Sequence, residues 1–153
     1  MANHIINSIE EWEALEGQDL GESHYFTIDQ TTINKFADAT GDHQWIHVDV
    51  ERAKKESPYK TTIAHGYLTI SLLPSLISQI FEARNTKMLI NYGIEDFRFA
   101  QAVPAGTEVN LNASVKEVKN LRGTLRVKIN VRLQIKGSNR PAFTGVIVFL
   151  YHY

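Results

Sequence analysis

The stretch YLTISLLPSLISQIF, from Tyr67 to Phe81, has apolar residues on nearly every face of a helix. A helix with this pattern is usually buried on most of its sides. We therefore expect it to form the core around which the rest of the chain packs. Pro74 lies inside the stretch, where a proline removes one backbone hydrogen bond and clashes with the preceding turn, so the helix should bend there.

The periodicity changes from helical to alternating after this helix. Turn-forming residues at 104–106, 120–123 and 136–138 separate segments that are rich in β-branched and aromatic side chains. These segments cover residues 88–99, 107–118, 124–135 and 142–151. The pattern predicts long antiparallel strands in a meander, and together with the helix it indicates a single α+β domain over residues 1–153.

The first half of the chain contains shorter elements. Residues 24–28 alternate as a strand does, and Asp29 is placed to cap a helix that ends at a Gly41 turn. Asp49 is placed to cap a second short helix over residues 50–56. Residues 1–20 show no clear pattern beyond loose amphipathicity, so we expect a loosely attached N-terminal lead.

Composition excludes several classes of protein. The net charge is −1 and the basic residues are scattered, which argues against a nucleic-acid partner. The chain has no cysteine, which excludes disulfides, thiolate nucleophiles and thiolate metal sites. The acidic N-terminus does not resemble a secretory signal, and the longest apolar tract is too short and polar to span a bilayer. The cytoplasm is the expected compartment.

The segment FADATGDHQWIH, residues 36–47, sets Asp42 and His47 around a glycine turn at Gly41. Residues five apart point away from each other on a helix or a strand, so the two side chains converge only if Gly41 to Ile46 is an irregular loop. A carboxylate and an imidazole that converge can activate water. The alternative is that Asp42 is a turn residue and His47 a buried polar neighbour.

Gly66 begins the apolar helix, directly after Ala64 and His65. An exposed backbone amide at the start of a helix suits a carbonyl oxygen that gains negative charge, although Gly66 can also be a simple turn residue. We expect His65 to form hydrogen bonds at the helix start rather than to act as a second base. His43 is expected to point to solvent.

A metal site and a substrate channel are further alternatives. Asp42, His43, His47 and Asp49 form a local cluster, but their spacing matches no helical metal signature, so no metal is expected. Tyr67, Asn91 and Tyr92 could line an acyl or pantetheine channel, although aromatic residues at such positions are equally typical of a core.

Several of these motifs together resemble the MaoC-like, R-specific enoyl-CoA hydratases. The resemblance extends from about Tyr25 to the C-terminus and rests on five short motifs. These are Gly41-Asp42-x-x-x-Ile46-His47, Ala64-His65-Gly66, Asn91-Tyr92-Gly93, Phe97-x-Phe99 and Pro104-x-Gly106.

The chain departs from the common form of that family at two places. Gln44 and Trp45 stand where asparagine and proline are usual, as in the NodN-like dehydratase branch. Many hydratases also carry a serine that orients the catalytic histidine. That position falls at or near Pro74 here, with Ser71 and Ser75 as possible substitutes.

The resemblance implies a hotdog fold, in which a curved antiparallel sheet wraps a long central helix, and a homodimer or dimer of dimers. It also implies a hydro-lyase that adds water to trans-2-enoyl-CoA, or runs the reverse dehydration of the (R)-3-hydroxyacyl-CoA. Asp42 and His47 would activate the water and Gly66 would bind the thioester carbonyl.

The resemblance also bears on cofactors and on rival activities. Coenzyme A would be part of the substrate, no cofactor would be needed, and an acyl-carrier protein could deliver the acyl group instead. The alternatives are a hotdog acyl-CoA thioesterase and a binding module for acyl thioesters without turnover.

Overall fold

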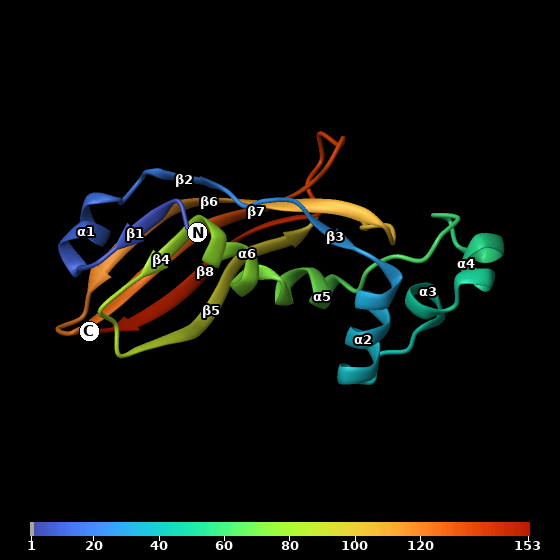
Figure 1. Ribbon diagram of the computed structural model, residues 1–153, viewed down its shortest axis with the longest axis horizontal. Coiled ribbons are helices and arrows are strands. Elements are labelled where there is room, and N and C mark those ends of the chain that lie inside the picture. Colours follow the sequence, from blue (N-terminus) through green and yellow to red (C-terminus); the bar gives the residue numbers. More distant parts are fainter. Residues whose placement is uncertain (1) are drawn as a thin grey trace.

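The computed structural model describes residues 2–153 and shows an antiparallel sheet crossed by a two-part helix (Figure 1). The six-stranded sheet has the order β2-β6-β7-β8-β5, and β3 also pairs with β6. Its long strands are β5 (Met88–Phe99), β6 (Thr107–Asn120), β7 (Thr124–Ile135) and β8 (Phe143–His152). The α+β class and the four long strand segments predicted from the sequence are confirmed.

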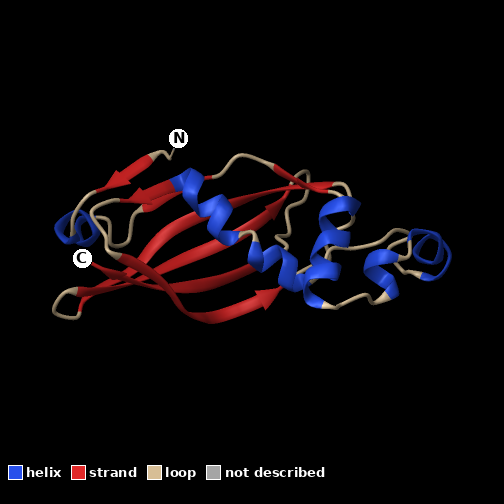
Figure 2. Ribbon diagram, turned by 60° about the horizontal axis from the view of Figure 1, so that its bottom comes forward, coloured by secondary structure: helices blue, strands red, loops and turns tan. Residues whose placement is uncertain are grey.

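The apolar segment forms two consecutive helices, α5 (Gly66–Ser71) and α6 (Leu73–Ile80). They meet at Leu72, and Pro74 occupies the first turn of α6, where a proline is tolerated. The predicted bend is therefore a change from one helix to the next. Figure 2 shows the two helices crossing one face of the sheet.

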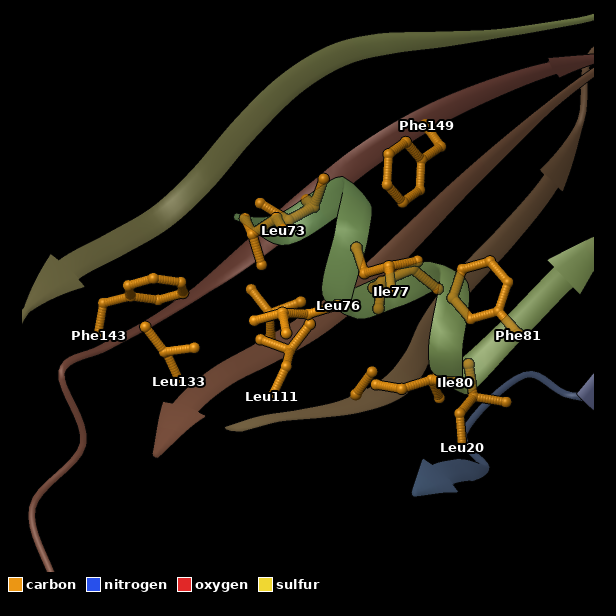
Figure 3. Close-up of a cluster of buried hydrophobic side chains, with 14 of the residues drawn as sticks. Leu20, Leu73, Leu76, Ile77, Ile80, Phe81, Leu111, Leu133, Phe143 and Phe149 are labelled. Atoms are coloured by element: carbon orange, nitrogen blue, oxygen red, sulfur yellow. The ribbon is translucent and has the colours of Figure 1, made fainter. Parts of the chain in front are cut away.

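The core lies between α6 and the inner face of the sheet (Figure 3). Because strand side chains alternate between faces, every second residue of β7 is buried, while β6 and β8 also contain runs of consecutive buried residues. Leu76 and Ile80 of α6 are buried here together with Leu111 and Leu133 of the sheet. This contact fixes the helix, and with it the start of α5, relative to the sheet.

One face of the helix pair is exposed, in contrast to the prediction of burial on most sides. Tyr67 is 73% exposed, and Pro74, Ser75 and Ser78 are exposed as well. The prediction of burial was wrong on this side of the helix pair, where Pro74 and the serines interrupt the apolar surface. Only the opposite face contributes to the core of the single chain.

The strand order corrects the prediction of a meander. β6, β7 and β8 are successive neighbours, but β5 pairs with β8 at the far edge of the sheet. Residues 100–106 therefore carry the chain back across the sheet. On the way Val103 accepts a hydrogen bond from the Ala64 amide at 2.8 Å, and Pro104 bridges to Ile63. This crossing forms one wall beside the start of α5.

The capping signals in the first half predict the helices well. After β3 (Phe26–Ile28), α2 (Gln30–Thr40) begins where the Asp29 carboxylate accepts the Thr32 amide at 2.8 Å. It ends at Gly41, which has a positive φ of 78°. The short helix α3 (Trp45–Val48), which was not predicted, precedes α4 (Val50–Glu56). Asp49 caps α4 as expected, accepting the Arg52 amide at 3.0 Å.

The N-terminal lead is integrated into the fold, which corrects the prediction of loose attachment. β1 (His4–Ile6) pairs in parallel with β4 (Phe81–Ala83), and β2 (Asp19–Glu22) pairs with β6. Between them α1 (Ile9–Ala14) buries Trp12 completely, with its ring 5.3 Å from that of Phe81. Among residues 2–153, no helix has the length and apolar character needed to cross a membrane.

Candidate active site

Asp42, His47 and His65 meet where α2, α3 and α5 approach one another. Each of them offers one side-chain oxygen or nitrogen, and these three atoms lie within 4.8 Å of one another. The left-handed Gly41 ends α2 and turns the chain, residues 41–44 are irregular, and α3 then carries His47. The predicted convergence of Asp42 and His47 through a loop is therefore what the structure shows.

A backbone carbonyl orients His47. The ring is buried, and its Nδ1 lies 2.7 Å from the Ile63 carbonyl oxygen. Since a carbonyl only accepts, Nδ1 carries the proton and donates it, which leaves the Nε2 lone pair free. The two serines considered from the sequence are not the partners: Ser71 donates to the Tyr67 carbonyl, and Ser75 is exposed.

His65 lies directly against His47. The two rings are stacked, with centroids 3.9 Å apart and planes inclined by 25°. Its Nε2 is 2.9 Å from the backbone carbonyl oxygen of Asp42. His65 is thus a hydrogen-bond donor at the helix start, as expected, but its acceptor belongs to the Asp42 loop rather than to the helix. His43 lies away from the group and pairs with Asp38 at 2.8 Å.

Burial lowers the pKa of His47 below its ordinary value of 6.5. The hydrogen bond to the Ile63 carbonyl raises the pKa, the neighbouring His65 lowers it, and the Asp42 carboxylate raises it, but burial is the largest contribution. His47 is therefore neutral near pH 7, with a lone pair on Nε2 that can accept a proton from water.

The lowered pKa of His47 predicts how activity and stability depend on pH. The acid limb of kcat/KM should have its midpoint below 6.5, because protonation of His47 removes the lone pair. Since the unfolded chain binds this proton more readily, the contribution of neutral His47 to stability is present above about pH 6.5 and is lost as the pH falls toward the lower, folded-state pKa. The kcat/KM profile, together with urea unfolding of the wild type and of His47→Gln across this range, measures both. An acid limb at or above 6.5 would contradict the assignment.

A cavity of about 320 Å³ opens beside His47. Gly66 lines it as the first residue of α5, so its N–H has no acceptor within the helix. A Cβ at this position would lie 2.8 Å from the ring of Phe99, which explains why glycine fits here. Thr69 of α5, Phe99 of β5 and Ala142 before β8 also line the cavity. Phe99 belongs to the Phe97-x-Phe99 motif, whereas no sequence motif pointed to Thr69 or Ala142.

A second groove of about 320 Å³ lies between the helix pair and β5. Asn91 and Tyr92 line it with Pro74 and Phe149, and most of its surface is apolar. These two residues thus occupy the kind of position expected for a channel, but in a groove that does not include His47. Tyr67 lines neither cavity and is exposed.

The geometry is a poor match for a metal site. Two members of the cluster considered from the sequence act elsewhere, because Asp49 caps α4 and His43 pairs with Asp38. His65 lies near His47 instead, but the two rings are nearly parallel and stacked. Ring lone pairs lie in the ring planes, so those of His47 and His65 do not converge on one point as metal ligands must.

Comparison with known proteins finds a matching family and similar relatives. The MaoC like domain matches residues 12–136. The 3-hydroxyacyl-thioester dehydratase Z of Mycobacterium tuberculosis is 41% identical over 147 residues, which cover 95% of this chain and 97% of that protein. The chain belongs to the MaoC-like family. This MaoC-like protein is also 46% identical to nodulation protein N of Rhizobium leguminosarum bv. viciae, over 84% of this chain and 81% of that protein.

Solved structures of MaoC-like proteins confirm the hotdog fold. The monoamine oxidase regulatory protein from Archaeoglobus fulgius superimposes with a TM-score of 0.81 at 23% identity, covering 99% of this chain and 98% of that one. An R-hydratase from Pseudomonas aeruginosa in the unliganded form superimposes with a TM-score of 0.73 at 23% identity, covering 90% and 81%. The similarity to nodulation protein N confirms the predicted resemblance to the NodN-like branch of the family.

Proposed function

We propose that this MaoC-like protein is an R-specific enoyl-CoA hydratase that also catalyses the reverse dehydration of 3-hydroxyacyl thioesters. The activity class rests on the dehydratase relative, which matches 95% of the chain at 41% identity. The observation that carries the proposal is the convergence of Asp42 and His47 beside a cavity that Gly66 also lines.

In the proposed reaction one water lies between the Asp42 carboxylate and His47 Nε2. As His47 Nε2 accepts a proton from the water, the water oxygen bonds to C3 of the enoyl thioester, and the electrons of the double bond move toward the carbonyl to form an enolate. The Gly66 N–H donates to the enolate oxygen. The proton then passes to C2, so that H and OH are added and nothing else is consumed. Dehydration follows the same steps in reverse.

One groove is a candidate path for the rest of the substrate. The apolar groove lined by Asn91 and Tyr92 fits an acyl or pantetheine chain. The exposed Tyr67 lies three residues before Ile70, which also lines this groove. The acyl group can be carried by coenzyme A or by an acyl-carrier protein. The cytoplasm is the compartment in which we place the reaction.

Hydration of crotonyl-CoA tests the activity and separates it from the alternatives. A hydratase consumes the enoyl thioester, measured by its absorbance, without releasing free thiol. A thioesterase releases coenzyme A, measured with a thiol reagent. A binding module binds the ligand but changes neither the enoyl absorbance nor the amount of free thiol. Thiol release at the rate of substrate loss would reject the hydratase.

We further propose that β5 joins two copies of the chain into a dimer. β5 is an edge strand of 12 residues, so the backbone groups on its outer side have no partner in the sheet. Its apolar side chains are exposed, with Tyr92 at 65% and Ile94 at 50%, and the exposed face of the helix pair lies along the same groove. A twofold axis at this edge pairs the strands and covers these side chains.

Ile94→Arg should convert the dimer to a monomer, because the proposed contact would bury an unpaired guanidinium group of each copy against apolar side chains. The matched control is Ile5→Arg, which places the same charge at an equally exposed residue, 47%, of β1 outside the main sheet. Sedimentation velocity of both variants at micromolar concentration measures the change. A wild-type protein that is a stable, active monomer would contradict the dimer.

A further inference from the structure

His65 is a buried imidazole that the proposed reaction does not use. Its side chain is 2% exposed, and it contacts both members of the Asp42–His47 pair. One nitrogen faces the Asp42 carbonyl and one ring face lies on His47, while Phe36 packs 4.9 Å from the ring. Such a residue can act on the reaction only through its neighbours.

We propose that His65 is a positioning residue, which holds the Asp42 backbone through its Nε2–H and holds the plane of the His47 ring through stacking. The consequence for catalysis rests on the proposed hydratase function. The positioning itself is a property of the folded chain and can be measured without substrate.

The hydrogen-bond partners assign the proton of His65. Because the Asp42 carbonyl only accepts, Nε2 must carry the proton, and Nδ1 is then a bare acceptor. Within residues 2–153 this Nδ1 is buried and has no hydrogen-bond partner. A buried acceptor without a partner costs free energy, and phenylalanine would fill a similar space without that cost. The Nε2–H donor is therefore the feature that an imidazole adds at this place.

Asp42 depends on this donor because its loop has few other restraints. The side chain is exposed, and within residues 2–153 its carboxylate accepts only a long hydrogen bond, 3.3 Å, from the Gln44 amide. Among the described residues, the bond from His65 is the contact that ties the Asp42 backbone to the start of α5. It sets the distance between the carboxylate and the wall of the cavity.

His47 is held at two places that together fix its free nitrogen. The Ile63 carbonyl fixes the position of Nδ1, and the face of His65 fixes the plane of the ring. With the Nδ1 position and the ring plane both fixed, the Nε2 lone pair points in a single direction. Misplacement of a reacting group by about 1 Å can cost about a hundredfold in rate, so both restraints matter for a water held between Asp42 and His47.

Two substitutions separate the two contacts. His65→Phe keeps an aromatic face against His47 but removes the donor, whereas His65→Gln keeps a donor near the Nε2 position but removes the stacked ring. We expect His65→Phe to lower kcat by about a hundredfold with KM changed less than about threefold, because the acyl groove is not touched. His65→Gln should recover part of kcat. The matched control, His43→Gln, removes an exposed imidazole of the same loop that does not contact His47 and should retain wild-type kcat.

Nuclear magnetic resonance of the imidazole nitrogens gives a readout that needs no substrate. In the wild type, the ¹⁵N shifts should place the proton of His65 on Nε2 and that of His47 on Nδ1. The ionisable groups that face His47 are Asp42 and His65. Removing His65 should therefore raise the titration midpoint of His47, while His43→Gln should leave it unchanged.

The outcomes separate this proposal from the hydratase proposal. A wild type that hydrates no enoyl thioester rejects the function, while the ¹⁵N shifts and the His47 titration still decide the positioning. A His65 proton on Nδ1, or a His65→Phe protein with wild-type kcat and an unchanged His47 titration, overturns the positioning. Should both variants fail to fold, the wild-type ¹⁵N assignment decides it.

Discussion

Asp42→Asn and His47→Gln are each expected to lower kcat for enoyl-CoA hydration by several orders of magnitude. Both side chains hold the same water, and the amide of asparagine or glutamine cannot accept a proton as carboxylate or neutral imidazole does. Asp42 is exposed and Gln is close to His in size, so neither change should unfold the protein. Steady-state kinetics with crotonyl-CoA, with thermal unfolding as a check, measure the effect.

The double variant distinguishes a shared water from two independent roles. Groups that act on one water fail together, so Asp42→Asn/His47→Gln should be little slower than the worse single variant. Asp38→Asn is the matched control, since it removes an exposed carboxylate from α2 that pairs with His43 and not with His47. A double loss equal to the product of the single losses, or near-normal activity in either single variant, contradicts the shared water.

Gly66→Pro should lower kcat by about a hundredfold or more relative to Gly66→Ala. Proline removes the one N–H that is proposed to bind the enolate oxygen, and it is well tolerated at the first position of a helix. The preceding His65 has φ −59° and ψ 138°, an extended conformation that a following proline accepts. The comparison of kcat values therefore isolates the amide.

Gly66→Ala is the necessary reference because both variants add a Cβ. In both, this atom must displace the Phe99 ring, which lies 2.8 Å from the Cβ position. Phe99 is half exposed, so its ring can move, and the displacement should affect KM for both variants alike. Equal kcat values for the proline and alanine variants would show that the Gly66 amide does not stabilise the transition state.

Elements that depend on local chemistry could be predicted from the sequence. Asp29 and Asp49 cap helices through amides three residues ahead, and Gly41 ends a helix through its own φ of 78°. The long strands follow from alternation that each segment shows by itself. In these cases the signal and the structure it specifies lie within a few residues of each other.

Features that depend on distant contacts could not be predicted in this way. The position of β5 beside β8 follows from cross-strand packing, as where Phe97 lies against Gly145. The N-terminal segment is held because Trp12 is covered by Phe81 and Tyr151, which are far away in sequence. The exposed face of the helix pair also depends on distant contacts, because the sheet covers only one side of α5 and α6 (Figure 2).

The candidate site likewise contains some residues that have local sequence signals and some contacts that depend on distant parts of the chain. Asp42, His47 and Gly66 can be predicted as candidates because they lie in short sequence motifs next to glycines and a turn. The acceptor that orients His47 is the backbone carbonyl of Ile63, and a backbone group leaves no trace in the amino-acid pattern. The stacking of His65 on His47 depends on how α3 and α5 approach each other, which is again a long-range property.

The proposal that Asp42 and His47 hold the reacting water is best tested by the stereochemistry of the product formed in the presence of a chelator. A water held on one side by Asp42 and His47 reaches only one face of the double bond, so a single enantiomer should form. The resemblance to R-specific hydratases predicts that this enantiomer has the R configuration. The protein is treated with a strong chelator and given crotonyl-CoA, and the product is offered separately to R- and S-selective 3-hydroxyacyl-CoA dehydrogenases. Full activity, with the product consumed by the R-selective enzyme alone, is the expected result. Consumption by the S-selective enzyme, or activity that returns only when zinc is added, would contradict it.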